Sequence, residues 1–371
     1  MAAIDVAEVL KRVTPLFQVE GSAEELVPYG SGHINDTFRL TCRLEDGGCK
    51  RYILQKMNTS IFKNTAGLME NVEKVTSFLR KKIVAAGGNP ERETLNLVST
   101  TEGKTYLESE GEFWRMYIFI ENATSFDEVK KPEDFYNSAV SFGNFQRLLA
   151  DYPADTLHET IVNFHNTVDR FSNFKKAVEE DVCGRAKDVQ KEIDFVMARE
   201  KDTHIICDAL AEKRIPLRVT HNDTKLNNIM IDDNTGKGLC VIDLDTVMPG
   251  SALYDYGDSI RFGASTGAED EPNLDLISVN LDLFDIYTKG YLEGCNNSLT
   301  KEEVELFPMG AKLMTFECGM RFLTDYLQGD VYFKIHRDGH NLDRARTQFK
   351  LVADMESKWD EMAAIVKKYS E

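Results

Sequence analysis

A short polar stretch between two apolar stretches, near the middle of the chain, constrains the fold more than any other feature. Residues 219–231 read Val-Thr-His-Asn-Asp-Thr-Lys-Leu-Asn-Asn-Ile-Met-Ile, and residues 240–245 read Cys-Val-Ile-Asp-Leu-Asp. The first stretch has the spacing His-x-Asp-x-x-x-x-Asn and runs into an apolar strand. The second stretch begins as a further apolar strand, and carboxylate residues follow at its end. We predict a loop bounded by strands and a second carboxylate-bearing loop shortly after it. The alternative is a polar hairpin in which Asp223 and Asn228 only cap turns.

Phosphoryl transfer explains each residue type in these two loops. Asp223 is placed to accept the proton of an attacking hydroxyl. Mg²⁺ prefers oxygen ligands, and Asn228 and Asp243 offer an amide oxygen and a carboxylate. We expect Asp245 either to be a second metal ligand or to contact the metal ligands without binding the metal itself. We expect His221 to brace the loop through hydrogen bonds rather than to transfer protons.

The charge balance excludes several classes of function. Lys and Arg total 44 against 62 Asp and Glu, which gives a net charge of −18 and a pI near 4.9. General binders of nucleic acid or of anionic membranes need a basic face, so neither class is expected. The seven cysteines are odd in number and show no C-x-x-C spacing, and no signal peptide or apolar run of about 18 residues is seen. We therefore expect a reduced, cytoplasmic protein.

Periodicity divides the chain into a β-rich first part and a helical remainder. Turn-rich and β-branched segments predict strands, whereas apolar residues at three- and four-residue spacing predict helices. The expected strands are 34–43, 51–57, 95–99, 105–107 and 113–121, and the expected helices include 65–82, 132–150 and 352–368. Thr300 and Glu303 form an expected capping box. This α+β outline gives a small lobe over residues 1–121 and a larger lobe over residues 122–371.

The two polar loops resemble the aminoglycoside phosphotransferase and choline kinase superfamily, which carries His-x-Asp-x-x-x-x-Asn followed by Ile-Asp. The resemblance implies a bilobal protein-kinase-like fold, with an antiparallel β-rich N-lobe that binds nucleotide and a mainly helical C-lobe. It also implies that Asp223 is the catalytic base and that Asn228 and Asp243 bind magnesium. It continues into residues 249–258, where the superfamily has a structural or substrate-side Asp.

The nucleotide side is expected in the first lobe. Gly30, Ser31 and Gly32 lie in a turn whose backbone N–H groups could approach phosphates. An ordinary turn is the alternative. Strand 51–57 offers Gln55 and Lys56 as phosphate contacts. Alternation along the strand decides which one faces the nucleotide, and we prefer Lys56 for its charge.

Two further nucleotide-side predictions concern acidic residues. The helix partner of the strand residue is expected to be Glu70 or Glu73, although both could be ordinary solvated helix charges. Strand 113–121 ends at Glu121, where this fold has a hinge whose backbone groups bind adenine.

The acceptor side is expected in the helical lobe. Residues 30–38, 52–58 with 62–64 and 69–71, and 220–228 resemble members of the superfamily that phosphorylate N-acetylhexosamines. This resemblance implies ATP and Mg²⁺ as cofactors and transfer of the γ-phosphate to the anomeric hydroxyl of N-acetylglucosamine or N-acetylgalactosamine. A neutral sugar needs a few converging hydrogen-bonding groups. We expect these at His165, Asp258, Arg261 and Arg321, each of which could instead belong to a structural ion pair or hydrogen bond. Lys225 could neutralise developing phosphoryl charge or face solvent.

Two alternatives stay open. One is a kinase for another small alcohol, such as choline, homoserine, hydroxylysine or an aminoglycoside. The other is a nucleotide-binding pseudokinase without catalysis. No coiled-coil heptads indicate an obligate partner, so a monomer or a weak homo-oligomer is expected.

Overall fold

A computed structural model describes residues 4–30, 34–126, 129 and 131–370. Its contacts group into two compact units. The N-terminal unit comprises Met1–Thr124 together with Met230–Val247, and the C-terminal unit comprises Ser125–Ile229 together with Met248–Glu371. The sequence predicts one boundary at residue 121, whereas the smaller unit of the structure also takes in a segment from beyond residue 229.

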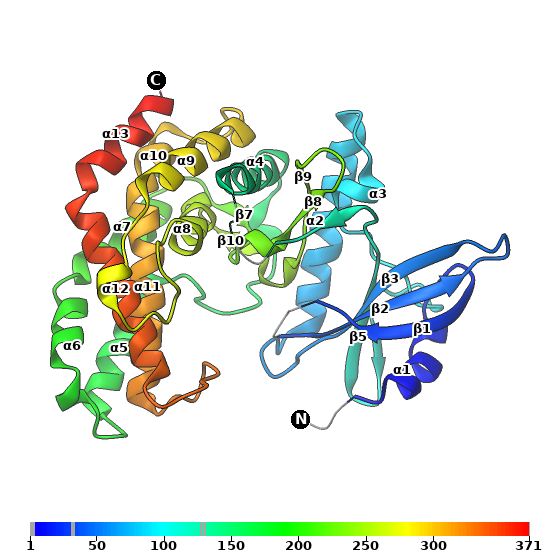
Figure 1. The fold of residues 1–371 in the computed structure, drawn as a ribbon, viewed down its shortest axis with the longest axis horizontal. Coiled ribbons are helices and arrows are strands. Elements are labelled where there is room, and N and C mark those ends of the chain that lie inside the picture. Colours follow the sequence, from blue (N-terminus) through cyan, green and yellow to red (C-terminus); the bar gives the residue numbers. More distant parts are fainter. Residues whose placement is uncertain (1–3, 31–33, 127–128, 130, 371) are drawn as a thin grey trace. The chain divides into compact units, whose positions relative to one another are not determined.

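A five-stranded antiparallel sheet forms the centre of the N-terminal unit, with the strand order β1-β2-β3-β5-β4. A second sheet has the order β6-β8-β9. The helices of this unit are α1 (Val6–Arg12), α2 (Thr65–Ala85) and α3 (Pro90–Glu93) (Figure 1). The strands are β1 (Ser22–Pro28), β2 (Asp36–Arg43), β3 (Cys49–Lys56), β4 (Leu107–Ser109), β5 (Glu112–Ile118), β6 (Ala123–Thr124), β8 (Ile229–Asp232) and β9 (Gly238–Val241).

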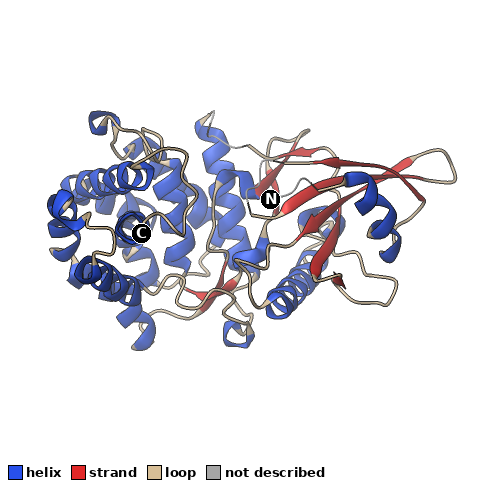
Figure 2. Ribbon diagram, turned by 90° about the horizontal axis from the view of Figure 1, so that it is seen from below, coloured by secondary structure: helices blue, strands red, loops and turns tan. Residues whose placement is uncertain are grey.

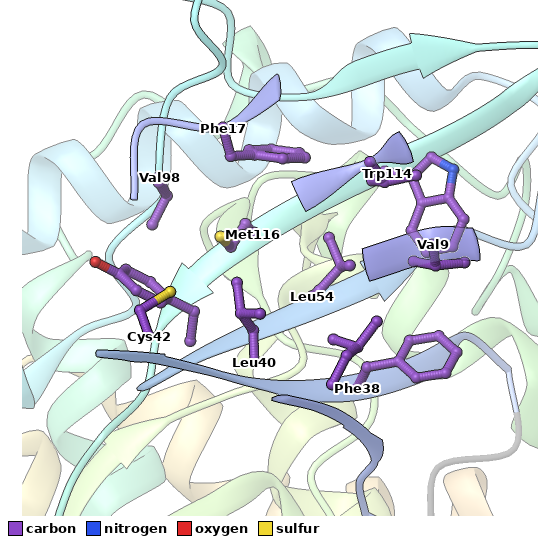
Figure 3. Close-up of a cluster of buried hydrophobic side chains, with 12 residues drawn as sticks. Val9, Phe17, Phe38, Leu40, Cys42, Leu54, Val98, Trp114 and Met116 are labelled. Atoms are coloured by element: carbon purple, nitrogen blue, oxygen red, sulfur yellow. The ribbon is translucent and has the colours of Figure 1, made fainter. Parts of the chain in front are cut away.

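One face of the five-stranded sheet carries the apolar core of this unit. Leu54 of β3 packs with Trp114 and Met116 of β5 (Figure 3), and Tyr52, two residues earlier in β3, belongs to the same buried cluster. Because side chains alternate across a strand, residues 51, 53 and 55 of β3 lie on the opposite face. This alternation fixes which polar side chains can reach the second carboxylate-bearing loop.

The C-terminal unit is mainly helical, as Figure 2 shows by its dominant blue ribbons. Its two short strands, β7 (Arg218–Thr220) and β10 (Met248–Gly250), pair antiparallel. Helix α4 packs on α9, and α11 packs on α5, α8 and α12. The helices are α4 (Pro132–Leu148), α5 (Thr167–Glu180), α6 (Gln190–Met197), α7 (His204–Ala211), α8 (Ala252–Gly263), α9 (Leu281–Cys295), α10 (Lys301–Glu305), α11 (Phe307–Gln328), α12 (His340–Ser357) and α13 (Trp359–Ser370).

Helix α8 is the most deeply buried helix of the site region, since all residues from Ala252 to Arg261 are buried. Tyr256 stacks on Phe307 with ring centroids 3.9 Å apart. At Gly257 the helix comes so close to α11 that an added Cβ would lie 2.2 Å from the carbonyl oxygen of Gly310. Only glycine permits this approach, which fixes the position of α8.

We expect Gly257→Ala to destabilise the protein by about 1–3 kcal/mol, because the added methyl group overlaps the backbone of α11. Gly310→Ala is the matched control on the facing helix, since its Cβ would meet Leu253 O at 3.0 Å rather than 2.2 Å. Thermal unfolding of the two variants measures the loss of stability that each substitution causes. A smaller loss for Gly257→Ala than for Gly310→Ala would contradict this packing.

The structure confirms most of the long predicted elements. Strands β2 and β3, helices α2 and α4, and the Thr300–Glu303 capping box all form. Residues 95–99 make only an isolated bridge and backbone hydrogen bonds to β5, so the strand predicted there is wrong. Strand β1 was not predicted, and the C-terminal helical region is two helices, α12 and α13, rather than one.

None of the helices formed by the described residues has the length and apolar character needed to cross a membrane.

Candidate active site

The catalytic loop, residues His221–Asn228, connects β7 to β8 within the motif predicted from the sequence. Asp255 in the first turn of α8 holds its backbone: the N–H groups of His221 and Asn222 donate to the two Asp255 carboxylate oxygens at 3.0 and 2.8 Å. Gln146 of α4 donates to the same carboxylate at 2.7 Å and to Val219 O at 3.0 Å. Burial raises the pKa of Asp255, and these donors offset only part of that effect.

Asp258, one turn further along α8, also fixes the loop. It accepts from the backbone N–H of Thr224 at 3.1 Å, and Ser259 donates to Thr224 O at 2.8 Å. Burial alone would raise the pKa of Asp258, but the charges of Arg261 and Lys225 hold it below its usual value. Asp258 was predicted as a sugar-site residue, and its contacts are those of a residue that positions the loop.

The carboxylate of Asp223 remains partly exposed and is oriented from both sides. Lys225 Nζ lies 2.8 Å from Oδ1, and Asn228 Nδ2 donates to Oδ2 at 3.2 Å and to the Asp223 carbonyl at 2.8 Å. Burial would lower the pKa of Lys225, but the carboxylates of Asp223 and Asp258 raise it, so the ammonium stays charged. A carboxylate held in this way can accept a proton from a hydroxyl placed against it.

His221 and Asn228 complete the loop. The His221 ring is fully buried against Phe142 and Phe145, and its Nδ1 accepts from the backbone N–H of Asp223 at 3.3 Å. That contact is what a bracing role requires. Because the Asn228 amide nitrogen donates to Asp223, its Oδ1 is left as an acceptor.

In the N-terminal unit the metal loop, residues Asp243–Thr246, follows β9 as a short 3-10 turn. Asp243 has a left-handed backbone, with φ of 57°. Asp245 is buried: one carboxylate oxygen lies 2.5 Å from Arg115 Nη1, and the other accepts from Asn35 Nδ2 at 2.7 Å. Oδ2 therefore accepts a hydrogen bond, whereas Oδ1 is paired in charge with Arg115 but accepts no hydrogen bond. The buried ion pair still disfavours the predicted role of Asp245 as a metal ligand.

The register of β3 determines whether Gln55 or Lys56 lies on the sheet face opposite the apolar core. Lys56 lies on the face of the apolar core, where its Nζ pairs with Glu112 at 2.5 Å. Gln55 lies on the opposite face and accepts from Arg115 Nε at 2.9 Å. The preference for Lys56 is therefore not supported, because alternation along β3 places this charged side chain on the face of the apolar core. Gln55 is the residue on the side of the metal loop.

Two of the acidic residues predicted for the nucleotide side, Glu70 and Glu121, form ion pairs. Glu70 pairs with Lys74 on the exposed face of α2, and Glu73 is also exposed. The α2 side chain that contacts Arg115 is Met69, at 3.9 Å. The side chain of Glu121 pairs with Arg51, and its carbonyl accepts from Arg92 Nη2 at 2.8 Å, so both groups are engaged within the protein. Gly30 has φ of 81°, and Ser31 and Gly32 lie outside the described residues.

The remaining acceptor-side predictions fall in a buried charged cluster of the C-terminal unit. His165 Nδ1 lies 3.0 Å from Glu317 Oε1, and Arg321 Nη1 lies 3.9 Å from the same oxygen. Arg261 is buried between Asp258 and Glu269, at 3.0 and 2.7 Å. Arg261 therefore acts as a structural cation, whereas Arg321 lines a cavity.

This cavity, which we call the Arg321 cavity, has a volume of about 260 Å³ between α5, α11 and the segment after α11. Its lining includes Arg170, Lys176, Arg321, Tyr332 and Phe333. Burial and the neighbouring charge of Arg321 lower the pKa of Arg170. The Arg321 guanidinium also faces the Tyr332 and Phe333 rings, 5.8 and 5.4 Å from their centroids. The cavity thus combines cationic and aromatic groups.

Glu317 gives a pH-dependent prediction. Burial would raise the pKa of Glu317, but His165, Arg321 and Arg170 hold it below its ordinary value of 4.5. The stabilisation of the fold by the ionised Glu317 carboxylate is therefore present above pH 4.5, and it is lost as the pH falls through the lower pKa of Glu317 in the folded state. We expect Glu317→Gln to make thermal unfolding less pH-dependent between about pH 5 and 3. Lys176→Gln, on an exposed pair, is the control, and an unchanged slope in Glu317→Gln would refute the prediction.

Several residues of the site were not found from the sequence. Asn35 contacts the predicted site residue Asp245 across 210 residues of sequence, and Arg115 and Gln146 occupy ordinary strand and helix patterns. Only the Asp-x-x-Asp spacing of 255 and 258 after the metal loop signalled that α8 carries polar groups toward the loop.

Asn228 and Asp243, the predicted metal ligands, belong to the C-terminal and the N-terminal unit respectively. Asn228 Oδ1 and the Asp243 carboxylate are hard oxygen donors of the kind Mg²⁺ binds, and such ions commonly complete their coordination with phosphates and water. Within the described ranges, no three His, Cys, Asp or Glu side chains gather as a metal-binding cluster.

Comparison with solved structures defines the class of fold. A microcompartment-associated aminopropanol kinase is 14% identical, with a TM-score of 0.63 over 97% of this chain and 99% of that chain. The amicoumacin kinase hAmiN, solved with AMP-PNP and Ca²⁺, is 12% identical, with a TM-score of 0.60 over 96% and 94%. A choline kinase from Cryptosporidium parvum Iowa II is 12% identical, with a TM-score of 0.55 over 93% and 93%. The α+β kinase-like fold is confirmed.

Residues 25–287 match the phosphotransferase enzyme family known as APH. This match covers most of the chain, and the protein belongs to that family.

Proposed function

We propose that the protein is an ATP- and Mg²⁺-dependent N-acetylhexosamine 1-kinase, which phosphorylates the anomeric hydroxyl of N-acetylglucosamine or N-acetylgalactosamine. The observation that carries the kinase assignment is the oriented, partly exposed Asp223 carboxylate between Lys225 and Asn228. The sugar assignment rests on the resemblance of residues 30–38, 52–58, 62–64, 69–71 and 220–228 to kinases of these sugars.

In the proposed reaction, Asp223 accepts the proton of the anomeric hydroxyl as the sugar oxygen bonds to the γ-phosphorus. The bond from that phosphorus to the β–γ bridging oxygen breaks in line, and ADP leaves. Lys225 offsets negative charge on the transferred group. Mg²⁺, bound through Asn228 and Asp243, would neutralise phosphate charge. The loop contacts from Asp255 and Asp258 keep Asp223 in place, so little reorganisation is needed during transfer.

We infer that the Arg321 cavity belongs to the acceptor site, and the charges that line it favour an uncharged acceptor over a cationic one. Three cations, Arg170, Lys176 and Arg321, line it together with the carboxylates of Glu180 and Asp325. The Asp325 carboxylate is already occupied, because it accepts from the backbone N–H groups of residues 331–333 at 2.7–2.9 Å. A quaternary or primary ammonium would meet repulsion there. A sugar can stack on Tyr332 or Phe333 and accept hydrogen bonds from the guanidinium groups.

Release of ADP in the presence of Mg²⁺ tests this proposal. N-acetylglucosamine and N-acetylgalactosamine should stimulate release, and the product should be the sugar 1-phosphate. Choline, homoserine, hydroxylysine and an aminoglycoside serve as competing acceptors. Stimulation by one of these cations alone would refute the sugar assignment. Binding of ATP with no consumption against any acceptor would favour a pseudokinase instead.

A further inference from the structure

We propose that Asn35, Arg115 and Asp245 form a polar clamp that positions the metal loop, and that Asp245 acts through this clamp rather than as a ligand of the metal. The inference rests on the proposed function, because it concerns how Asp243 is presented to a magnesium nucleotide. All three residues belong to the N-terminal unit.

The first step is the environment of the Asp245 carboxylate. Its side chain is buried, Oδ1 lies 2.5 Å from Arg115 Nη1 in an ion pair but accepts no hydrogen bond, and Oδ2 accepts from Asn35 Nδ2 at 2.7 Å. A metal ion at Oδ2 would have to displace the Asn35 amide, and one at Oδ1 would meet the positive charge of the Arg115 guanidinium. Removing one partner of a buried ion pair is costly, because the other charge is then left uncompensated. Asp245 is therefore better suited to hold the loop than to bind the ion.

The second step is the placement of Arg115. Its side chain is 1% exposed and lies on the sheet face opposite the apolar core. Its Nε donates to Gln55 at 2.9 Å, and Gln55 Nε2 donates to Thr37 Oγ1 at 3.1 Å. Burial would lower the pKa of Arg115, but Asp245 and other neighbouring groups raise it, so the guanidinium is a permanent buried cation. The metal loop is thus attached to strands β2, β3 and β5 by one polar chain.

The third step is the link to the glycine turn. Asn35 directly precedes β2 and follows Gly30 by five positions in the sequence. Its Oδ1 accepts from the Asn58 backbone N–H at 3.0 Å, while its Nδ2 donates to Asp245. The side chain therefore has a fixed amide orientation and connects the segment after the turn to the metal loop.

The consequence concerns Asp243, which lies two residues before Asp245 in the same short turn. Fixing Asp245 restricts where the Asp243 carboxylate can lie before the metal nucleotide arrives. Groups that orient a ligand without touching the metal commonly change metal affinity by about 10- to 100-fold. We therefore expect the clamp to affect binding of the metal-bound nucleotide more than binding of the nucleotide alone.

Calorimetry without acceptor tests the clamp, using AMP-PNP with Mg²⁺ and AMP-PNP with EDTA. We expect Asn35→Ala and Asp245→Asn each to weaken Mg²⁺·AMP-PNP binding by about tenfold or more, with little change in EDTA. Glu24→Gln, on an exposed pair with Arg43, should match the wild type. Thermal unfolding of each apo variant checks that it is folded, and Asn35→Ala keeps the Arg115–Asp245 pair if Asp245→Asn does not fold.

The outcomes separate the two proposals. Weakening by Asp245→Asn with no effect of Asn35→Ala would make Asp245 a direct ligand and overturn the clamp. Equal losses with Mg²⁺ and with EDTA would also overturn it, because a general structural defect behaves in that way. If the wild type binds no nucleotide, the proposed function fails as a whole. If the wild type and both variants bind Mg²⁺·AMP-PNP equally, the clamp alone fails.

Discussion

Asp223→Asn is expected to lower turnover by about 10²- to 10⁴-fold, which is the usual contribution of a general base. Asparagine has the same shape and can keep the contact with Asn228, but it cannot accept the proton of the attacking hydroxyl. It also removes the charge that Lys225 pairs with at 2.8 Å. Nucleotide binding should persist, since no step of binding needs this proton transfer.

Steady-state ADP release with the sugar acceptor, combined with AMP-PNP calorimetry, measures the two effects separately. Asp208→Asn is the matched control, because Asp208 is an exposed carboxylate of α7 in the same unit. Turnover of Asp223→Asn near the wild-type rate would remove Asp223 from the reaction. Loss of nucleotide binding together with turnover would instead indicate a structural role.

The second large effect is expected from Asp255→Asn in helix α8. Asp255 accepts three hydrogen bonds, and the asparagine amide nitrogen would face at least one of these donors instead of accepting from it. A buried donor left unsatisfied costs about 1–3 kcal/mol. The catalytic loop should therefore loosen, with turnover reduced in addition to stability.

A comparison with Gln146→Leu separates the effect of Asp255 on turnover from its effect on stability. That variant removes one donor to Asp255 but leaves the contacts to the His221 and Asn222 backbone intact. We expect it to lower the unfolding temperature while reducing turnover less than Asp255→Asn does. Equal turnover in Asp255→Asn and the wild type, measured below both unfolding temperatures, would contradict the role of Asp255 in positioning the loop.

Local patterns predicted the fold well. Apolar periodicity located α2, Pro132 marked the start of α4, and the spacing of Asp223, Asn228 and Asp243 singled out the two loops of the proposed site. These features depend on residues close together in sequence. The sequence could not show that Asp245 is neutralised by Arg115, because that contact depends on the register of distant strands.

Two nucleotide-side predictions depend on contacts of the same kind. Charge favours Lys56, but alternation along β3 turns it toward the apolar core and Glu112. Position on the predicted helix favours Glu70, whereas the buried face of α2 presents Met69 to Arg115. In both positions, packing across the sheet decides which side chain is available, and this cannot be obtained from a single strand or helix.

The N-terminal unit is built from two separate chain segments, and this affects the order in which its parts are synthesised. Its β9 strand and metal loop are made only after the first half of the C-terminal unit. Until Asp245 has emerged, the Arg115 side chain lacks the carboxylate that compensates its charge. We therefore expect the nascent N-terminal sheet to remain incompletely packed while more than a hundred further residues are added. A fragment ending at Thr124 should likewise be unable to reach the native packing around Arg115.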